Sequence, residues 1–191
     1  DGAVLDAVGR VETRLTELGA TVTPVSLPSA RAALSAYYLI ASAEASSNLA
    51  RYDGMITGTR VGANAEGHVD VMTQTRGEGF GTEVRRRILM GTFALSAGHV
   101  DAWYRRALQV RRKVADEMFR AFESVDVLLT PTAPTAAYLL GSKSNDPLAM
   151  YLGDVDTVLA NLAGVGAISI PYGSDAAGLP VGAQFMAPPL Q

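Results

Sequence analysis

The chain has 191 residues, of which 48% are hydrophobic and 18% are charged, and its formal net charge at pH 7 is -3. This composition is typical of a soluble globular unit with a buried core, and the slight negative charge excludes a global basic field that would recruit nucleic acid. The sequence contains no cysteine, which excludes thiol catalysis, disulfides and cysteine-based zinc sites. We therefore expect residues 1–191 to form a single unit.

The start of the sequence and its uncharged segments bear on where the protein acts. The chain begins with Asp1, and no charged region followed by an apolar segment is found there, so we expect a piece of a longer protein without a signal peptide. The longest uncharged run, residues 157–174, contains asparagine, glycine and proline and does not predict a membrane helix. With the lack of cysteine, this predicts a cytoplasmic protein that contacts no membrane.

The first fifty residues predict a helix, a strand and a second helix. Apolar residues at helical spacing predict the first helix over residues 4–18, and Gly19 is expected to end it. Residues 21–27 predict a strand, which the proline within it would confine to a sheet edge. Ser35 is expected to cap a helix that reaches about Ala50.

The middle of the chain combines a polar connection with the strongest helical pattern. Residues 62–81 are rich in glycine and predict a loop with short helical pieces, whereas residues 82–96 predict a helix. The next helix carries an apolar stripe at helical spacing, which predicts packing against a sheet. The stripe comprises Trp103, Ala107, Val110, Val114, Met118, Ala121 and Val125.

The last third of the chain predicts three strands. Residues 126–134 read as a buried strand that ends in a stiff loop, and residues 166–173 and 179–187 read as two more strands joined by a turn. Helices that alternate with strands indicate an α/β layered unit around a mixed β-sheet.

Two adjacent serines, Ser46 and Ser47, raise the possibility of a nucleophile. A serine nucleophile needs a base within hydrogen-bond reach, and Glu44 lies too few residues away to share a helix face with Ser46. Small residues such as Ala41 and Ala45 instead allow a helix to approach its neighbours closely. We therefore interpret the pair as structural.

Charged residues with two open interpretations occur in three places. Arg87 lies beside the small residues at 91 and 94 and has room to reach a carboxylate, whereas Arg85 is expected to be exposed. The alternative for Arg87 is a surface pair with Glu83, one helical turn away. Asp154 and Asp156 are each candidates either for the N-cap of a helix that reaches residue 162 or for binding a ligand amine.

The third place is a basic segment, residues 104–113, which is a candidate for binding RNA phosphates. Arg105, Arg112 and Asp116 share the helix face opposite the apolar stripe, which favours a solvated face. His68 and His99 have no histidine one turn away, so no helix-borne metal pair is expected.

Five segments of the sequence carry a family resemblance that periodicity does not reveal. They are SAYYLIASAEASSNLARYDG, TRGEGFGTEVRRRILMGTFALSAG, LLTPTAPTAA, NDPLAMYLGDVDTVLANLAG and ISIPYG followed by GLPVGAQF. Together they resemble the carboxyl-terminal half of the A subunits of aspartyl/glutamyl-tRNA(Asn/Gln) amidotransferases, which are members of the amidase signature family. The resemblance covers nearly the whole chain.

The resemblance implies a fold and a reaction. The family fold is an α/β/α sandwich on a large mixed sheet, and the full-length subunit hydrolyses glutamine to glutamate and ammonia. The ammonia reaches a partner subunit, which amidates Glu-tRNA(Gln) or Asp-tRNA(Asn) after activation with ATP. The implied partners are the B and C subunits, with tRNA bound mainly by the partner. ATP and Mg are used there, and no cofactor or metal is expected on this chain.

The resemblance also assigns residues. The family's catalytic lysine and two serines, one of them in a cis-peptide, belong to the amino-terminal half, so no catalytic residue is expected here and Ser46 and Ser47 are not the family's serines. Glutamine binding is implied for Tyr38, for Arg87 at the α-carboxylate and for Asp154 at the α-ammonium. The chain departs from the family at Leu159 and Gly166, where proline is usual, and at Tyr172, where cysteine is usual.

Two alternatives remain open beside this interpretation. The chain could belong to another amidase signature hydrolase that acts on a different amide, or it could be a non-catalytic module that docks partner subunits. The choice between Gln-tRNA and Asn-tRNA synthesis would rest with the other subunits.

Overall fold

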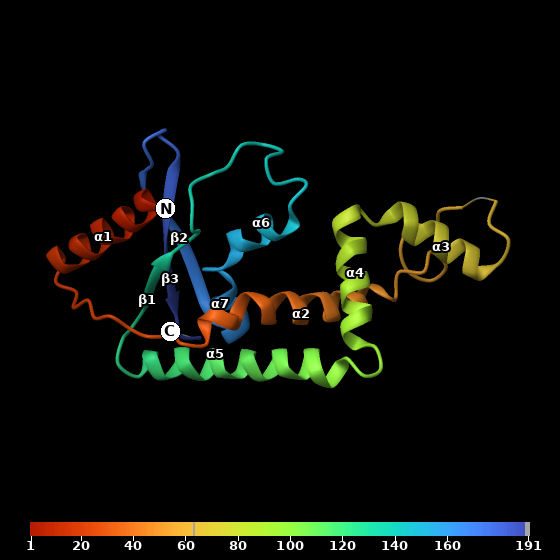
Figure 1. The fold of residues 1–191 in the computed structure, drawn as a ribbon, viewed down its shortest axis with the longest axis horizontal. Helices are drawn as coiled ribbons and strands as arrows, with labels where there is room; N and C mark the ends of the chain where they lie inside the picture. Colours follow the sequence, from red (N-terminus) through yellow and green to blue (C-terminus); the bar gives the residue numbers. More distant parts are fainter. Residues whose placement is uncertain (63, 190–191) are drawn as a thin grey trace. The chain divides into compact units, whose positions relative to one another are not determined.

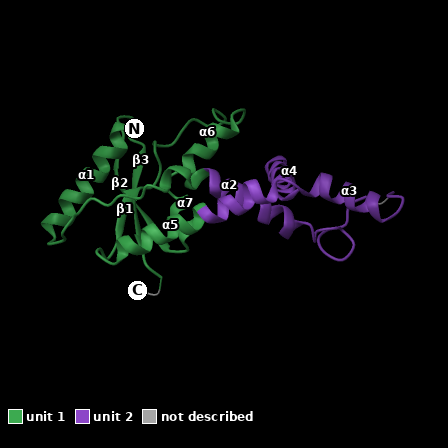
Figure 2. Cartoon of the chain, turned by 60° about the horizontal axis from the view of Figure 1, so that its bottom comes forward, with its two compact units in different colours: residues 1–34, 110–191 green, residues 35–109 purple. Residues whose placement is uncertain are grey.

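The computed structural model describes residues 1–62 and 64–189, so position 63 of the predicted loop and the last two residues lie outside the described part. The described residues form two compact units, residues 1–34 with 110–191 and residues 35–109 (Figure 2). Helices α2 (Ala30–Leu49) and α5 (Arg106–Phe122) contribute residues to both units. The expectation that residues 1–191 form a single unit, as the carboxyl-terminal part of a larger domain, stays a prediction.

The first unit is built around a small sheet. In the described part of the chain, β1 (Leu128–Pro131), β2 (Gly166–Ser174) and β3 (Pro180–Ala187) pair antiparallel in the order β1-β3-β2 (Figure 1). Asp175 forms the turn between β2 and β3, since its carboxylate accepts from the backbone N–H groups of Ala177 and Leu179 at 2.9 Å. The three predicted strands and the α/β class are therefore confirmed.

Helix α1 (Gly2–Glu17) covers one face of this sheet. Its side chains Val4 and Ala7, both almost completely buried, form an apolar cluster with Val181 of β3. The predicted first helix is thus confirmed, and Gly19 follows it with a φ of 94°, a conformation that glycine adopts without steric cost.

Helix α7 (Val158–Ala163) belongs to the opposite face. Because side chains alternate along a strand, Gln184 of β3 points away from α1, and its Nε2 donates to the carbonyl of Asp156 at 3.0 Å. Helix α5 is tied to α7 by Arg111, whose Nε donates to the carbonyl of Leu162 at 3.2 Å. The unit therefore has helices on both faces of its sheet.

Helix α5 follows the predicted apolar stripe. Its buried members are Ala107, Val114, Met118 and Ala121. The helix is preceded by one π-helical turn, Val100–Arg105, in which Trp103 remains 46% exposed. The predicted stripe is therefore largely buried within α5, whereas its first residue, Trp103 in the π-helical turn, is exposed.

The strand predicted over residues 21–27 is absent, and this prediction was wrong. The segment has no regular structure, and Val22 and Val25 are 43% and 42% exposed. Valine and threonine favour strands only where a neighbouring strand and a buried face are available, and no neighbouring strand pairs with this segment in the described part of the chain.

Helix α2 begins five residues earlier than predicted, at Ala30, so Ser35 does not cap it. The reason is a carboxylate from α5. Glu117 accepts from the backbone N–H of Ser29 at 2.9 Å and from its hydroxyl at 2.7 Å, immediately before the first turn of α2. A negative charge at this position stabilises the start of a helix.

The second unit contains α3 (His68–Gly79) and α4 (Thr82–Leu95) beside most of α2. Helix α4 was predicted, but α3 replaces much of the loop expected over residues 62–81, which was wrong. Arg76 of α3 donates through Nη1 to the carbonyls of Leu49 at 2.7 Å and Tyr52 at 3.2 Å. These tertiary bonds offset the low helix propensity of the glycines.

Two short elements precede α7, namely α6 (Pro147–Tyr151) and the 3-10 turn Leu152–Asp154. Asp146 caps α6, since its carboxylate accepts from the backbone N–H of Ala149 at 3.0 Å. No helix in the described part of the chain is long and apolar enough to cross a bilayer.

Candidate substrate-binding site

Arg87 of helix α4 forms an ion pair with a glutamate of the same helix. Arg87 Nε lies 3.0 Å from Oε1 of Glu83, one turn earlier, and its side chain is 31% exposed. The second oxygen of the same carboxylate pairs with Arg86. The predicted pair between Glu83 and Arg87 therefore exists, but it is part of a cluster of one carboxylate and two guanidinium groups.

The guanidinium of Arg87 also lies over an aromatic ring. Its Cζ is 5.5 Å from the ring centroid of Tyr38 on α2, and Tyr38 is only 7% exposed. The neighbouring Tyr37 meets Tyr38 edge-on at a centroid distance of 5.2 Å. A cation over an aromatic face is attracted by the ring quadrupole, so this contact favours the position of Arg87 beside α2. The structure brings together two of the three predicted binding residues.

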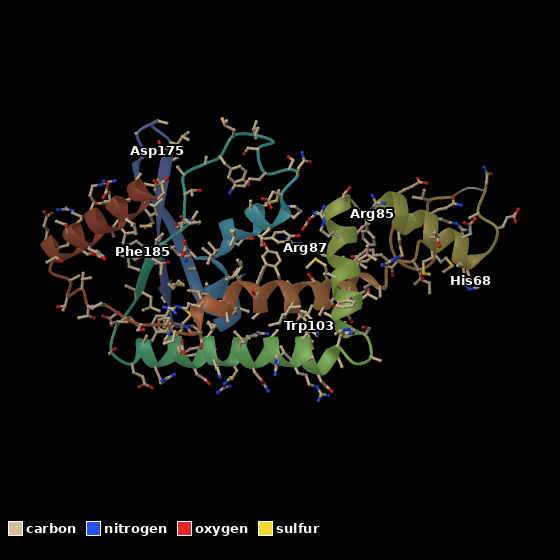
Figure 3. The ribbon with its side chains drawn as sticks, viewed as in Figure 1. His68, Arg85, Arg87, Trp103, Asp175 and Phe185 are labelled. Atoms are coloured by element: carbon tan, nitrogen blue, oxygen red, sulfur yellow. The ribbon has the colours of Figure 1, made fainter. Side chains whose placement is uncertain are left out.

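Arg85 takes a different direction from the same helix, as the helical spacing predicts. It is exposed, and its Nη1 donates to the carbonyl of Gly77 at 3.2 Å, so it extends toward α3 while Arg87 leaves the other side of α4 (Figure 3). The two arginines therefore form a matched pair for comparison.

The two serines of α2 serve helix packing. Ser46 Oγ lies 2.9 Å from Oγ1 of Thr92 on α4, and Ser47 is exposed. A Cβ built on Gly91 of α4 would collide with the carbonyl oxygen of Ser42 and would lie 2.7 Å from Cβ of Ser46. The small residues allow α2 and α4 to touch backbone to backbone, which confirms the structural interpretation of the serine pair.

The predicted ammonium ligand, Asp154, ends the 3-10 turn Leu152–Asp154 and is exposed. Its backbone carbonyl accepts from the N–H and the hydroxyl of Thr157, both at 3.1 Å. Thr157 is the N-cap residue of α7, so the N-cap prediction was wrong for both Asp154 and Asp156. Helix α7 follows this turn, and its N-cap residue makes no side-chain capping hydrogen bond.

Asp156 is less suited than an exposed carboxylate to hold a cation. Burial raises the pKa of the Asp156 carboxyl, because removal from water disfavours its charged form. Asp154 is exposed whereas Asp156 is half-buried, so a ligand ammonium would reach the Asp154 side chain more readily. Tyr38 and Arg87 belong to the unit of residues 35–109 and Asp154 to the other, and their common site stays a prediction.

The basic segment pairs with acids of its own helix. Arg105 Nε lies 3.0 Å from Asp101, and Arg112 Nε lies 2.8 Å from Asp116. The arginine side chains are 72% and 80% exposed, which is typical of a solvated face. Among the described residues, no group of three or more His, Asp or Glu side chains is placed to hold a metal ion.

We predict that reversing both charges, with Arg105→Glu and Arg112→Glu, leaves RNA affinity unchanged. Each arginine that neutralised a phosphate would contribute about one unit to the slope of affinity against salt concentration. The measurement is RNA binding by the full-length protein at several salt concentrations. A fall in affinity together with a shallower salt slope would support the RNA interpretation instead.

The sequence profile of the Amidase family matches residues 1–191. The chain belongs to the Amidase family. The membership confirms the resemblance that the five segments indicated, and it agrees with the α/β fold. The chain spans about 36–38% of the length of curated relatives that it matches.

Several relatives of this chain carry the same description. The chain is 57% identical over 178 residues to the A subunit of glutamyl-tRNA(Gln) amidotransferase from Synechococcus sp., covering 93% of this chain and 36% of that one. Proteins of the same name from Symbiobacterium thermophilum and Deinococcus radiodurans are each 55% identical, covering 99% and 100% of this chain and 38% of their own length.

Solved Amidase family structures have the same fold. The crystal structure of the A subunit of glutamyl-tRNA(Gln) amidotransferase from Thermotoga maritima is 38% identical with a TM-score of 0.70, covering 98% of this chain and 35% of that chain. A crystal structure described as an amidase is 25% identical with a TM-score of 0.70, covering 97% of this chain and 38% of that chain.

The three positions at which the family resemblance implies departures, Leu159, Gly166 and Tyr172, belong to the first unit. Leu159 is 7% exposed within α7, and Gly166 begins β2. The carbonyl of Tyr172 accepts from Nη2 of Arg10 on α1 at 3.5 Å. Leucine is therefore accommodated in the core of the unit, and Tyr172 contacts α1 through its backbone.

The sequence analysis did not predict that Glu83 contributes to the site. It was treated only as a partner in a surface pair, although its carboxylate joins two arginines. The signal was present in the segment EVRRR, where residues three and four positions after a glutamate both lie on its side of a helix.

Proposed function

We propose that this chain is the glutamine-binding part of the glutaminase subunit of a tRNA-dependent amidotransferase. The observation that carries the proposal is the fixed cation of Arg87 over the buried ring of Tyr38, in a chain whose relatives are named as A subunits of glutamyl-tRNA(Gln) amidotransferase. Arg87 is suited to the α-carboxylate of glutamine because its planar fork binds a carboxylate with two hydrogen bonds.

In this proposal, the two charges of the amino acid have separate partners. Arg87 binds the α-carboxylate, Asp154 binds the α-ammonium, and Tyr38 forms a wall of the site. A pair of fixed opposite charges selects a free amino acid over a simple amide, because an amide without these charges would leave both groups unpaired. The catalytic lysine and serines would come from the rest of the full-length protein.

The proposal extends to the complex. The ammonia released from glutamine would be used by a partner subunit that converts Glu-tRNA(Gln) or Asp-tRNA(Asn) to Gln-tRNA(Gln) or Asn-tRNA(Asn). We propose the B and C subunits as partners in the cytoplasm, with ATP, Mg and most tRNA contacts on the partner's side.

The test is substrate preference in the full-length protein. Ammonia release is measured from glutamine and from simple carboxamides at equal concentrations, with and without the partner subunits. Faster release from glutamine supports the proposal. Faster release from simple carboxamides would favour another amidase that acts on a different amide, and binding of partner subunits without any ammonia release would favour a docking module.

We predict that the 191-residue chain alone releases no ammonia from glutamine. The hydroxyl of Ser46 contacts a threonine, and Ser47 is exposed on α2, so neither has the base that a serine nucleophile requires. Ammonia is measured with the purified chain and with a Ser46→Ala variant. Activity above background that disappears in the variant would contradict this prediction.

A further inference from the structure

The carboxylate of Glu83 is shared between two arginines of α4, and each oxygen has its own partner. Oε1 accepts from Nε of Arg87 at 3.0 Å, and Oε2 accepts from Nη1 of Arg86. The three side chains are between 31% and 42% exposed, so each is partly shielded from solvent. One carboxylate therefore joins two guanidinium groups of the same helix.

The contact geometry fixes Arg87 in two directions. Glu83 engages the Nε side of the guanidinium, and its Cζ lies over the Tyr38 ring at 5.5 Å from the ring centroid. Arginine has a long side chain whose rotamer freedom must be lost before its fork can meet a carboxylate with two hydrogen bonds. A contact at Nε orients the fork and itself engages one of the five N–H donors of the guanidinium.

Glu83 lies where a carboxylate is favourable. It is in the first turn of α4, where the partial positive charge of the helix end stabilises a carboxylate. One of its oxygens pairs with Arg86 and the other with Arg87. Glu83 can therefore orient Arg87 through a single oxygen.

We infer that Glu83 is a positioning residue for glutamine binding, which acts by holding Arg87 in the orientation that receives the substrate carboxylate. This inference rests on the proposed function, because it concerns the same arginine. It assigns a role to a side chain that does not itself touch the substrate. A glutamate that merely formed a surface pair would have no effect on substrate affinity.

The experiment compares Glu83→Ala, Glu83→Gln, Arg87→Ala and Asp101→Ala in the full-length protein, with KM and kcat measured for glutamine. Asp101 is the matched control, because it pairs with Arg105 Nε at the same spacing and the same distance of 3.0 Å. We expect Glu83→Ala to raise KM about tenfold while kcat changes less than about twofold, as loss of uniform binding does. Glu83→Gln is expected to lie closer to the original protein, because its amide oxygen still accepts from Nε.

The outcomes separate this inference from the proposed function. If Arg87→Ala raises KM but Glu83→Ala behaves like Asp101→Ala, the positioning role is wrong and the proposed function stands. A lower KM in Glu83→Ala would also overturn it, because Glu83 would then compete with the substrate. If Arg87→Ala leaves KM and kcat unchanged, the proposed role of Arg87 itself fails. Equal melting temperatures of all four variants exclude unfolding as the cause.

Discussion

Replacing Gly91 by alanine is expected to lower the free energy of unfolding by about 3 kcal/mol, which is a large effect for one added methyl group. The new Cβ would collide with the carbonyl oxygen of Ser42 and would lie 2.5 Å from the carbonyl carbon of that residue. These are backbone atoms of α2, which cannot turn away as a side chain does. The two helices would have to separate, and the packing around them would be lost.

The control for this variant is the same substitution in an open helix. Gly77 lies within α3, and a Cβ built on it has nothing within 4 Å. Gly77→Ala is expected to raise stability by about 0.5–1 kcal/mol, because alanine is the better helix former. Urea unfolding of the two full-length variants measures the difference. Similar behaviour of the two variants would mean that α2 and α4 do not touch at Gly91.

The elements that were predicted correctly have local causes. Helices α1, α4 and α5 have apolar residues at helical spacing or glycines at their ends. Strands β2 and β3 are short apolar runs joined by a turn. Two of the errors, over residues 21–27 and 62–81, have non-local causes. Helix α3 depends on Arg76 reaching carbonyls more than twenty residues away, and residues 21–27 have strand-forming residues without a pairing strand.

The candidate site was partly predictable for the same reason. Gly91 and Ala94, which lie one and two helical turns after Arg87, are both buried, which is why helical spacing could single out Arg87 among the three arginines. Tyr38 is 49 positions earlier than Arg87 on another helix, and no spacing rule connects the two. Only the family resemblance assigned Tyr38 to the site and chose Asp154 over Asp156, because contacts between distant elements leave no periodic signal in one sequence.

Replacing Arg87 by alanine in the full-length protein is expected to lower kcat/KM for glutamine about 100-fold or more. Removing one partner of a desolvated charged contact costs about 2–5 kcal/mol, and each 1.4 kcal/mol is a factor of ten. Asp154→Ala is expected to have a similar effect. Arg87→Lys is expected to be nearly as poor as alanine, because an ammonium group cannot provide the two parallel hydrogen bonds of a guanidinium.

The control for Arg87 is Arg85, which leaves the other side of the same helix and is exposed. Arg85→Ala is expected to change kcat/KM less than about threefold, since exposed charges contribute little. Stability should change only modestly in the Arg87 variant, because its helix pair with Glu83 contributes about 0.3–0.5 kcal/mol and its contact with the Tyr38 ring about 0.5–1 kcal/mol. Steady-state kinetics with glutamine measure the contrast. Equal activity of the Arg85 and Arg87 variants would remove Arg87 from the substrate site and leave it as a member of a surface ion pair.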